Sequence, residues 1–185
     1  FRRLYPKVQV EVHLSNRNID FVAEGYDMAV RVRAQPDSTL IARPLEDARL
    51  AVVASPEYLA RAGTPLTLDD LEQHDCIQFE LPSSGRPITW LFNEDGKARE
   101  MLTSGGYLCS DDVLAGVTLA KHGAGLFQTY RFIVERELAE GSLLEVLQPF
   151  SGRSRPFTLL YPHSRHMPLR LRAFVNFIMD KKQAW

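Results

Sequence analysis

The chain has 185 residues, 45% of them hydrophobic and 24% charged, so it can bury a core as one large domain or two small ones. Its formal net charge of −1 gives no electrostatic attraction for nucleic acid. No apolar run approaches the roughly 20 residues that cross a bilayer, and the start of the chain has no secretory signal. The two cysteines do not make a disulfide framework, which favours the reducing cytoplasm.

The first residues look like the end of a helix. Phe1, Leu4 and Tyr5 are spaced as on one helical face, and Pro6 stops the helix. Because no capping residue precedes this turn, we expect the chain to be a fragment that has lost its N-terminal part.

Strand and helix patterns alternate through the first half of the chain. Residues 8–14 alternate apolar and polar side chains, which predicts a strand with one buried face. The patterns that follow predict a short helix over 19–24, a strand over 27–33, extended segments over 40–45 and 50–54, a helix capped by Ser55, a short helix from Thr67, a strand over 76–79, and a β-hairpin that turns at 93–96.

The stretch 106–128 reads as strand, polar turn, helix, glycine and strand. Ser110 or Asp111 is a preferred N-cap for the helix, and Gly123 ends it. A strand, a helix and a strand in this order form a right-handed βαβ unit with parallel strands. Ligands bind at the carboxyl ends of such strands, so we expect Ser110 and Asp111 to line a cleft.

The last third of the chain continues the alternation. It predicts a helix over 130–139, an extended segment over 143–147, a strand over 157–161, and a final helix with an apolar stripe. Strands that alternate with helices indicate an α/β architecture. The hairpin near residue 95 interrupts this order and suggests two lobes, each with a mixed sheet, with a small-molecule cleft between them.

The order and spacing of several motifs are familiar. They are Tyr5-Pro6-x-Val8-x-Val10-x-Val12, Ser15-Asn16-Arg17, Asp27-Met28-Ala29-Val30-Arg31-Val32, Ala54-Ser55-Pro56-Glu57-Tyr58-Leu59, Gly123-Ala124-Gly125-Leu126, Glu137-Leu138-x-x-Gly141-x-Leu143, and Tyr161-x-x-x-Arg165-x-x-x-x-Arg170-x-Arg172-x-Phe174-Val175-x-Phe177. Together they cover nearly the whole chain, which resembles the effector-binding domain of LysR-type transcriptional regulators.

This resemblance implies an α/β fold of two Rossmann-like lobes, similar to type-2 periplasmic binding proteins. Residues 1–53 and 163–185 would form lobe I, and residues 54–162 lobe II. A winged helix-turn-helix, a linker helix and the first strand of lobe I would precede this chain. The resemblance also implies a homodimer or homotetramer, with the helix after Asp112 against the first helix and strand of a partner. The chain departs from the family at Tyr130, where a proline is usual, and at Asn16, where an aspartate is common.

Residues from both lobes are candidate ligand contacts. Backbone N–H groups near Ser110 could bind an anion, the alternative being that Ser110 and Asp111 only cap the helix. Spacing alone favours the caps, whereas the resemblance favours a ligand contact for Ser110 and leaves Asp111 as a cap. Arg31 and Arg33 suit bidentate recognition of a carboxylate, the alternative being solvated or ion-paired arginines. The remaining candidates are Ser15 and Asn16 after the first strand and Gln128, which could orient a ligand or satisfy a loop.

Catalysis is weakly indicated. The sequence has no G-x-S-x-G elbow, and Ser110 has no histidine at a spacing that predicts a triad. His163 and His166 lack a third metal ligand, and the two cysteines read as buried thiols, although a redox pair stays open. We therefore expect no enzyme, no cofactor and no metal.

The hypothesis that follows is a cytoplasmic ligand-sensing domain of a bacterial transcriptional regulator. A small anionic or aromatic metabolite would bind between the lobes, and DNA would be bound only through the missing N-terminal part. The alternative is a periplasmic solute-binding protein of a transporter, which shares the fold.

Overall fold

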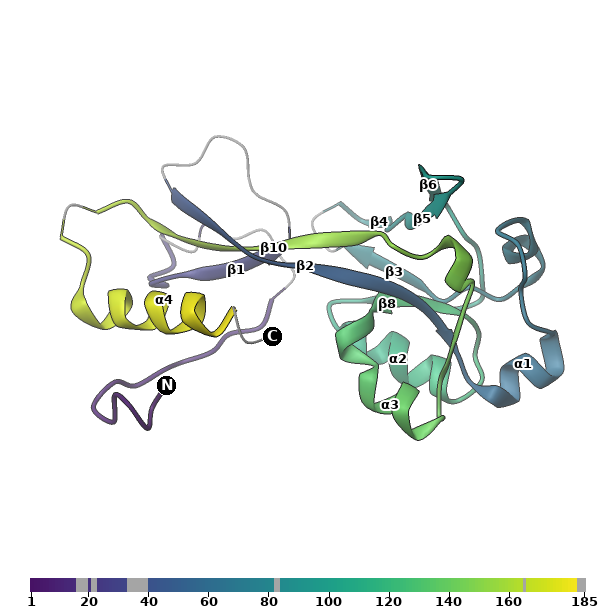
Figure 1. The fold of residues 1–185 in the computed structure, drawn as a ribbon, viewed down its shortest axis with the longest axis horizontal. Coiled ribbons are helices and arrows are strands. Elements are labelled where there is room, and N and C mark those ends of the chain that lie inside the picture. Colours follow the sequence, from purple (N-terminus) through teal and green to yellow (C-terminus); the bar gives the residue numbers. More distant parts are fainter. Residues whose placement is uncertain (16–19, 21–22, 33–39, 82–83, 165, 183–185) are drawn as a thin grey trace. The chain divides into compact units, whose positions relative to one another are not determined.

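The computed structural model describes residues 1–15, 20, 23–32, 40–81, 84–164 and 166–182. The chain forms two compact units (Figure 1). The first unit comprises residues 1–14, 19–47 and 155–185, and the second comprises residues 15–18 and 48–154. The predicted lobe boundaries at 53/54 and 162/163 stay a prediction.

The two units carry opposite charge. The sequence of the first unit has twelve Lys and Arg against eight Asp and Glu, and that of the second has ten against fifteen. The formal net charges are therefore +4 and −5, which together give the −1 of the whole chain.

Within the described residues of the first unit, one helix packs on three neighbouring strands of a sheet. The sheet has the order β1-β10-β2, and β1 pairs antiparallel with β10. The elements are β1 (Ala29–Val32), β2 (Leu40–Ala54), β10 (Ser154–Pro162) and α4 (Leu169–Lys181). From α4, Leu171 and Val175 are buried against Leu159 and Tyr161 of β10, so the predicted apolar stripe is confirmed.

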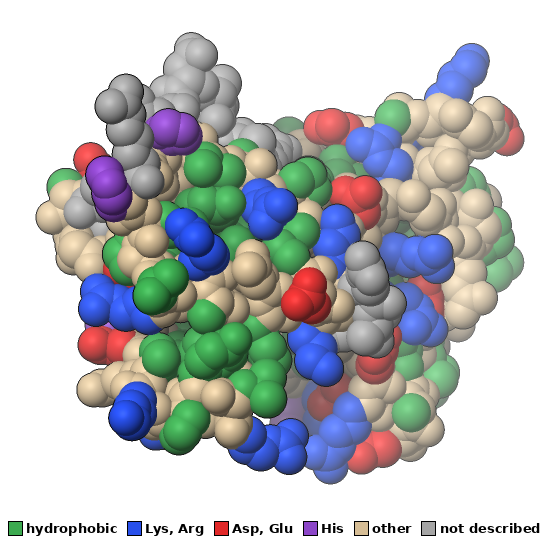
Figure 2. All heavy atoms as spheres, turned by 60° about the vertical axis from the view of Figure 1, so that its left-hand side comes forward, with side chains coloured by type: hydrophobic (Ala, Val, Ile, Leu, Met, Phe, Trp, Pro, Cys, Tyr) green, Lys and Arg blue, Asp and Glu red, His purple; other side chains and the backbone are tan. Residues whose placement is uncertain are grey.

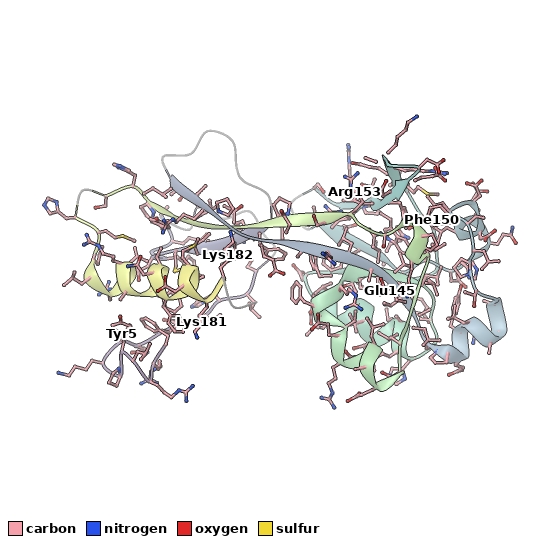
Figure 3. The ribbon with its side chains drawn as sticks, viewed as in Figure 1. Tyr5, Glu145, Phe150, Arg153, Lys181 and Lys182 are labelled. Carbon is pink, nitrogen blue, oxygen red and sulfur yellow. The ribbon has the colours of Figure 1, made fainter. Side chains whose placement is uncertain are left out.

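The N-terminal residues form a single helical turn against α4. The amides of Leu4 and Tyr5 donate to the Phe1 carbonyl at 2.9 and 3.0 Å. The Phe1 ring lies edge-on to Phe174 and Phe177 of α4, with centroids 4.7 and 5.4 Å away. Figure 3 labels Tyr5 on this turn.

The strand predicted over 8–14 is wrong, because this segment belongs to no strand in the described residues. Val12 is 75% and Leu14 94% exposed, so the apolar face that the alternation predicts is not buried. Alternation only sorts side chains onto two faces, and a strand also needs a neighbour to satisfy its backbone. Hydrophobic side chains reach the surface among Lys and Arg on the face of the molecule shown in Figure 2. Half of the helix predicted over 19–24 lies outside the described residues, which show a turn at 23–25.

The second unit contains most of the secondary structure. Its elements, beyond the second half of β2, are α1 (Pro56–Ala62), η1 (Asp69–Gln73), β3 (Gln78–Leu81), β4 (Arg86–Pro87), β5 (Trp90–Glu94), β6 (Lys97–Met101), β7 (Leu108–Ser110), α2 (Val113–Lys121), β8 (Phe127–Tyr130), η2 (Arg131–Ile133), α3 (Glu135–Glu140), β9 (Leu144–Val146) and η3 (Gln148–Phe150).

The predicted βαβ unit is present, with a third strand between its two strands. β7 pairs parallel with β3, and Leu126 at the start of β8 forms a parallel bridge with Cys76 just before β3. α2 connects β7 to β8 and contacts both. The far side of β8 pairs antiparallel with β2, where Tyr130 lies opposite Leu50. The helix predicted to start at Tyr130 is therefore wrong at its start, and the chain continues through η2 before α3.

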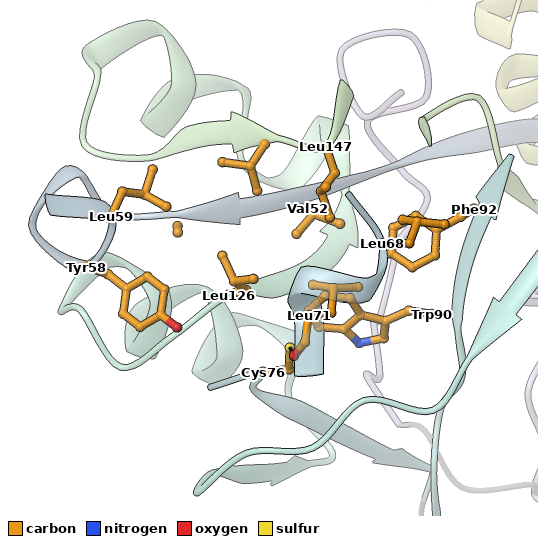
Figure 4. Packing of buried hydrophobic residues seen from close by; sticks show 12 residues of the cluster. Val52, Tyr58, Leu59, Leu68, Leu71, Cys76, Trp90, Phe92, Leu126 and Leu147 are labelled. Carbon is orange, nitrogen blue, oxygen red and sulfur yellow. Dashed lines mark hydrogen bonds between the residues drawn. The ribbon is translucent and has the colours of Figure 1, made fainter. Parts of the chain in front are cut away.

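Both faces of this sheet are covered. On one face, Phe127 and Cys109 pack in one buried cluster with Val117 and Ala120 of α2. On the other, the β5–β6 hairpin contributes a second cluster, whose members are shown in Figure 4: Val52, Ala54, Tyr58, Leu59, Leu68, Leu71, Cys76, Trp90, Phe92, Leu126, Val146 and Leu147. The predicted hairpin is thus confirmed, with Asp95 and Gly96 at positive φ in its turn.

Candidate functional site

The loop that opens α2 is organised by three successive polar residues. Asp112 is the N-cap, because its Oδ1 accepts the Leu114 N–H at 2.9 Å. Asp111 has a left-handed backbone with φ +62°, and the Asp112 N–H donates to the Ser110 carbonyl at 2.7 Å. The predicted caps Ser110 and Asp111 are therefore wrong. The chain bends at Asp111, which leaves Asp112 as the residue whose carboxylate reaches the free amides of the first turn.

Ser110 and Gln128 lie on the same face of the sheet. Their neighbours Cys109 and Phe127 point into the cluster under α2, and alternation along a strand turns the next side chain to the opposite face. Ser110 is exposed at the carboxyl end of β7, level with Glu80 of β3. The hydroxyl of Ser110 is thus accessible at the strand ends where α/β proteins bind ligands.

The Gln128 side chain joins β8 to the hairpin. Its Oε1 accepts the Leu91 N–H at 2.8 Å, and its Nε2 donates to the Leu91 carbonyl at 3.0 Å. The Gln128 amide thereby forms the two main-chain hydrogen bonds that a neighbouring strand would otherwise form with Leu91. One lone pair and one N–H of Gln128 stay available, since a primary amide offers two of each.

Gln128 borders a shallow depression within the second unit. Its other polar walls are Glu145 of β9 and Arg153, and its apolar walls include Phe92 and Phe150 (Glu145, Phe150 and Arg153 are labelled in Figure 3). The cavity itself has a volume of about 10 Å³. Small-molecule pockets span roughly 300–1,000 Å³, so this depression is too small for a typical effector.

The other sequence-derived candidates are dispersed. Arg31 lies in β1 of the first unit, half-buried and opposite Thr158 of β10. Ser15 is exposed. Asn16 and Arg33 lie outside the described residues. The structure therefore places Ser15, Ser110, Asp111 and Gln128 in one unit and Arg31 in the other.

The sequence does not predict the buried polar cluster around Tyr58 and His74. The Tyr58 hydroxyl of α1 contacts His74 Nδ1 at 2.9 Å and accepts the Asp75 N–H at 3.0 Å. Tyr58 is 2% and His74 8% exposed. Burial lowers the pKa of His74 and raises that of Tyr58. No motif links the two side chains, because sixteen residues separate them.

The two cysteines cannot form a redox pair in this fold. Cys76 packs with the hairpin cluster and Cys109 with the α2 cluster, on opposite faces of the sheet. Cys109 pairs with Phe79, three residues beyond Cys76, which is about 10 Å along a strand. A disulfide needs Cα atoms within about 7 Å.

Within the described ranges, no three His, Cys, Asp or Glu residues gather as metal ligands. In those same ranges, no helix combines the length and the apolar character that a membrane span requires.

Known proteins match this chain along almost its whole length. The sequence model of the LysR substrate binding domain matches residues 1–183. The probable regulator LtrA of Klebsiella pneumoniae is 32% identical over 97% of the chain, and PtxR of Pseudomonas aeruginosa is 36% identical over 97%. The chain spans 58% and 57% of these two relatives, both described as HTH-type transcriptional regulators.

Solved structures agree with the sequence relatives. The LysR-type regulator CrgA of Neisseria meningitidis superposes with a TM-score of 0.85 at 30% identity, over 98% of this chain and 60% of that one. The virulence activator AphB of Vibrio cholerae gives a TM-score of 0.82 at 26% identity, over 98% of this chain and 60% of that one.

These matches confirm the α/β fold of two-lobed, type-2 periplasmic-binding-protein-like regulatory domains. Proteins of this kind are transcription factors and not enzymes. The chain therefore belongs to the LysR-type transcriptional regulators, as their effector-binding domain.

Proposed function

We propose that this domain senses a small anionic or aromatic metabolite, which binds between its two lobes and changes promoter binding by the intact cytoplasmic regulator. The observation that carries the proposal is the family match over residues 1–183 of a chain that divides into two compact units. Among its crossings between these units, the chain passes from one to the other within β2 and at the start of β10. A ligand that prefers one arrangement of two such units shifts their equilibrium by its differential affinity.

Ser110, Asp111, Ser15, Asn16, Arg31, Arg33 and Gln128 are the proposed ligand contacts. Ser110 supports the assignment because its exposed hydroxyl stands at the carboxyl end of β7, beside the start of α2. Arg31 offers a guanidinium that would pair with a carboxylate. Asp111 contributes its main chain, since its carboxylate would repel an anion.

A thermal-shift screen with small carboxylates and aromatic acids tests the proposal. A ligand that binds only the folded state raises the melting temperature in step with its concentration above Kd. For any hit, Ser110→Ala and Arg31→Ala should weaken the shift. The exposed residues Ser104 and Arg172 provide matched controls, and their alanine variants should respond like the wild type. Equal shifts in all four variants would remove Ser110 and Arg31 from the site.

We also propose that a winged helix-turn-helix, a linker helix and one more strand precede this domain in the intact protein. Support comes from β1, which has one ladder partner among the described residues and exposes Val30 and Val32 by 45% and 37%. A further strand beside β1 would satisfy its free edge. Hydrogen exchange at Val30 and Val32 should slow in the intact regulator, and unchanged exchange would count against the added strand.

The proposed assembly is a homodimer or homotetramer. Leu114 of α2 is 54% exposed and Leu108 of β7 is 56% exposed, which leaves apolar surface for a second copy. Leu114→Asp should therefore lower the association state in sedimentation equilibrium. Leu66→Asp is the control, because Leu66 is 76% exposed in a loop outside this surface.

A further inference from the structure

The buried contact between Tyr58 and His74 includes none of the proposed ligand contacts. The Tyr58 oxygen accepts the Asp75 N–H, and His74 Nδ1 is the one acceptor that the Tyr58 hydrogen has among its described contacts. We assign the hydroxyl as the donor to His74, since the opposite direction would leave that hydrogen without an acceptor. This arrangement needs an imidazole whose Nδ1 carries a lone pair. His74 must then be neutral, with its hydrogen on Nε2.

Tyr58 holds α1 at a junction of several elements. His74 follows η1, and Asp75 precedes β3. The Asp75 carbonyl also accepts the Leu126 N–H at 2.8 Å, at the start of β8. α1 itself follows β2 directly through its N-cap, Ser55, so any movement of α1 acts on the end of that long strand.

We propose that His74 is a proton-sensitive latch, which holds α1 against the junction of η1 and β3 at neutral pH and releases it in acid. Protonation places a hydrogen on Nδ1 and removes the only acceptor that the Tyr58 hydroxyl has among its described contacts. A buried hydroxyl without an acceptor is unfavourable, so protonation of His74 favours detachment of α1.

The surroundings of His74 set the pH of release. Asp70 and Asp75 favour the charged imidazole, and Arg61 of α1 lies 5.6 Å from the centre of the Tyr58 ring. Cys76, just before β3, stays neutral, since burial raises its pKa to about 12. Burial outweighs both aspartates and lowers the pKa of His74, which keeps the latch closed at pH 7.

The sign of the effect follows from linkage. A histidine with a lowered folded-state pKa binds fewer protons in the closed state than in the open one. Its stabilisation is complete above the ordinary pKa of 6.5 and is lost as the pH falls through the folded-state pKa. Between these two pKa values, each fall of one pH unit raises the equilibrium constant for opening of α1 by up to about tenfold.

Hydrogen exchange measured by NMR between pH 7.5 and 5.0, corrected for intrinsic rates, tests the latch. The amides of Leu59 in α1 and of Gly63 at its C-cap should open more often as the pH falls. The amide of Leu138 in α3, bonded to the Val134 carbonyl at 2.9 Å, should not change. Equal acceleration in α1 and α3 would show general acid unfolding and overturn the proposal, as would flat exchange in α1.

Two variants and a matched control sharpen the test. His74→Gln keeps an acceptor for Tyr58 and does not titrate, so α1 should be protected equally at both pH values. Tyr58→Phe should expose α1 equally at both. His122→Gln replaces an exposed histidine and should behave like the wild type. A pH response that persists in His74→Gln would refute the latch.

Titration of the wild type gives a readout that does not depend on any variant. The ¹⁵N shifts of His74 should report a neutral Nδ1 acceptor at pH 7.5 and a pKa below 6.5, equal to the midpoint of α1 opening. A pKa at or above 6.5, or a different midpoint, would contradict the proposal.

Discussion

Both polar ends of the Gln128 side chain bind the main chain of Leu91, at 2.8 and 3.0 Å. Leu91 is 7% exposed, so its N–H and carbonyl would find little water if Gln128 were shortened. We expect Gln128→Ala to lower the free energy of unfolding by about 1–3 kcal/mol. Urea denaturation measures the loss, with Gln73→Ala at an exposed position as the control. Equal stability of the two variants would mean that the Leu91 bonds contribute nothing net.

Gly116 allows α2 to approach β8. A Cβ at this position would lie 2.4 Å from Cζ of Phe127, a ring that is 1% exposed. Alanine favours a helix by roughly 1 kcal/mol over glycine, but a clash with a buried ring costs about 1–3 kcal/mol. Gly116→Ala should therefore destabilise the domain in thermal melts.

Gly106 is the matched control for this substitution. A Cβ there meets nothing within 4 Å, and its φ is not positive. Gly106→Ala should leave the melting temperature nearly unchanged. A stabilised Gly116→Ala variant would show that Phe127 moves aside without cost.

The thiols of Cys76 and Cys109 should be unreactive in the folded protein. They are 1% and 8% exposed, and burial raises the pKa of both, that of Cys76 to about 12. Since the thiolate is the reactive form, neither should react with Ellman's reagent at pH 8, and both should react in denaturant. Rapid labelling of Cys109 without denaturant would reveal local opening beside α2. A disulfide-linked monomer after mild oxidation would contradict the register of β3 and β7.

Asp70 should stabilise the loop before η1 in a pH-dependent way. Its Oδ2 accepts the Thr67 and Leu66 N–H groups at 2.8 Å each, and these bonds lower the pKa of the carboxyl group. A lowered carboxyl pKa gives stability above the unfolded value of 3.8 that is lost as the pH falls through the folded value. Asp70→Ala should thus be less stable than the wild type at pH 7, and the difference should shrink towards pH 3. A difference that is independent of pH would assign the effect to packing.

Those parts of the fold that depend on neighbouring residues in the chain were predicted well. Ser55, Pro56 and Gly63 mark the start and end of α1 as expected, because caps and φ preferences act within a few residues. The cap of α2 was misplaced because Ser110, Asp111 and Asp112 are all competent caps. Only the left-handed bend at Asp111 selects the third of them.

Long-range pairing was less predictable. Leu40–Ala54 is one strand where the sequence predicts two segments, since the charged residues Glu46, Asp47 and Arg49 interrupt the apolar pattern without ending the pairing. The alternation over 8–14 predicted burial that only a neighbouring strand could supply. The prediction of the candidate site has the same limit. The sequence shows that Gln128 is polar, but it does not reveal the partner Leu91, which lies 37 residues away.

The near-neutral charge of the whole chain conceals the segregation of its charges. A first unit of +4 and a second of −5 present two oppositely charged surfaces to any resin, lipid or macromolecule they meet. The chain should consequently be retained at low ionic strength by cation and anion exchangers alike, near its isoelectric point of about 6.6. Purification schemes based on the isoelectric point alone would mispredict its elution.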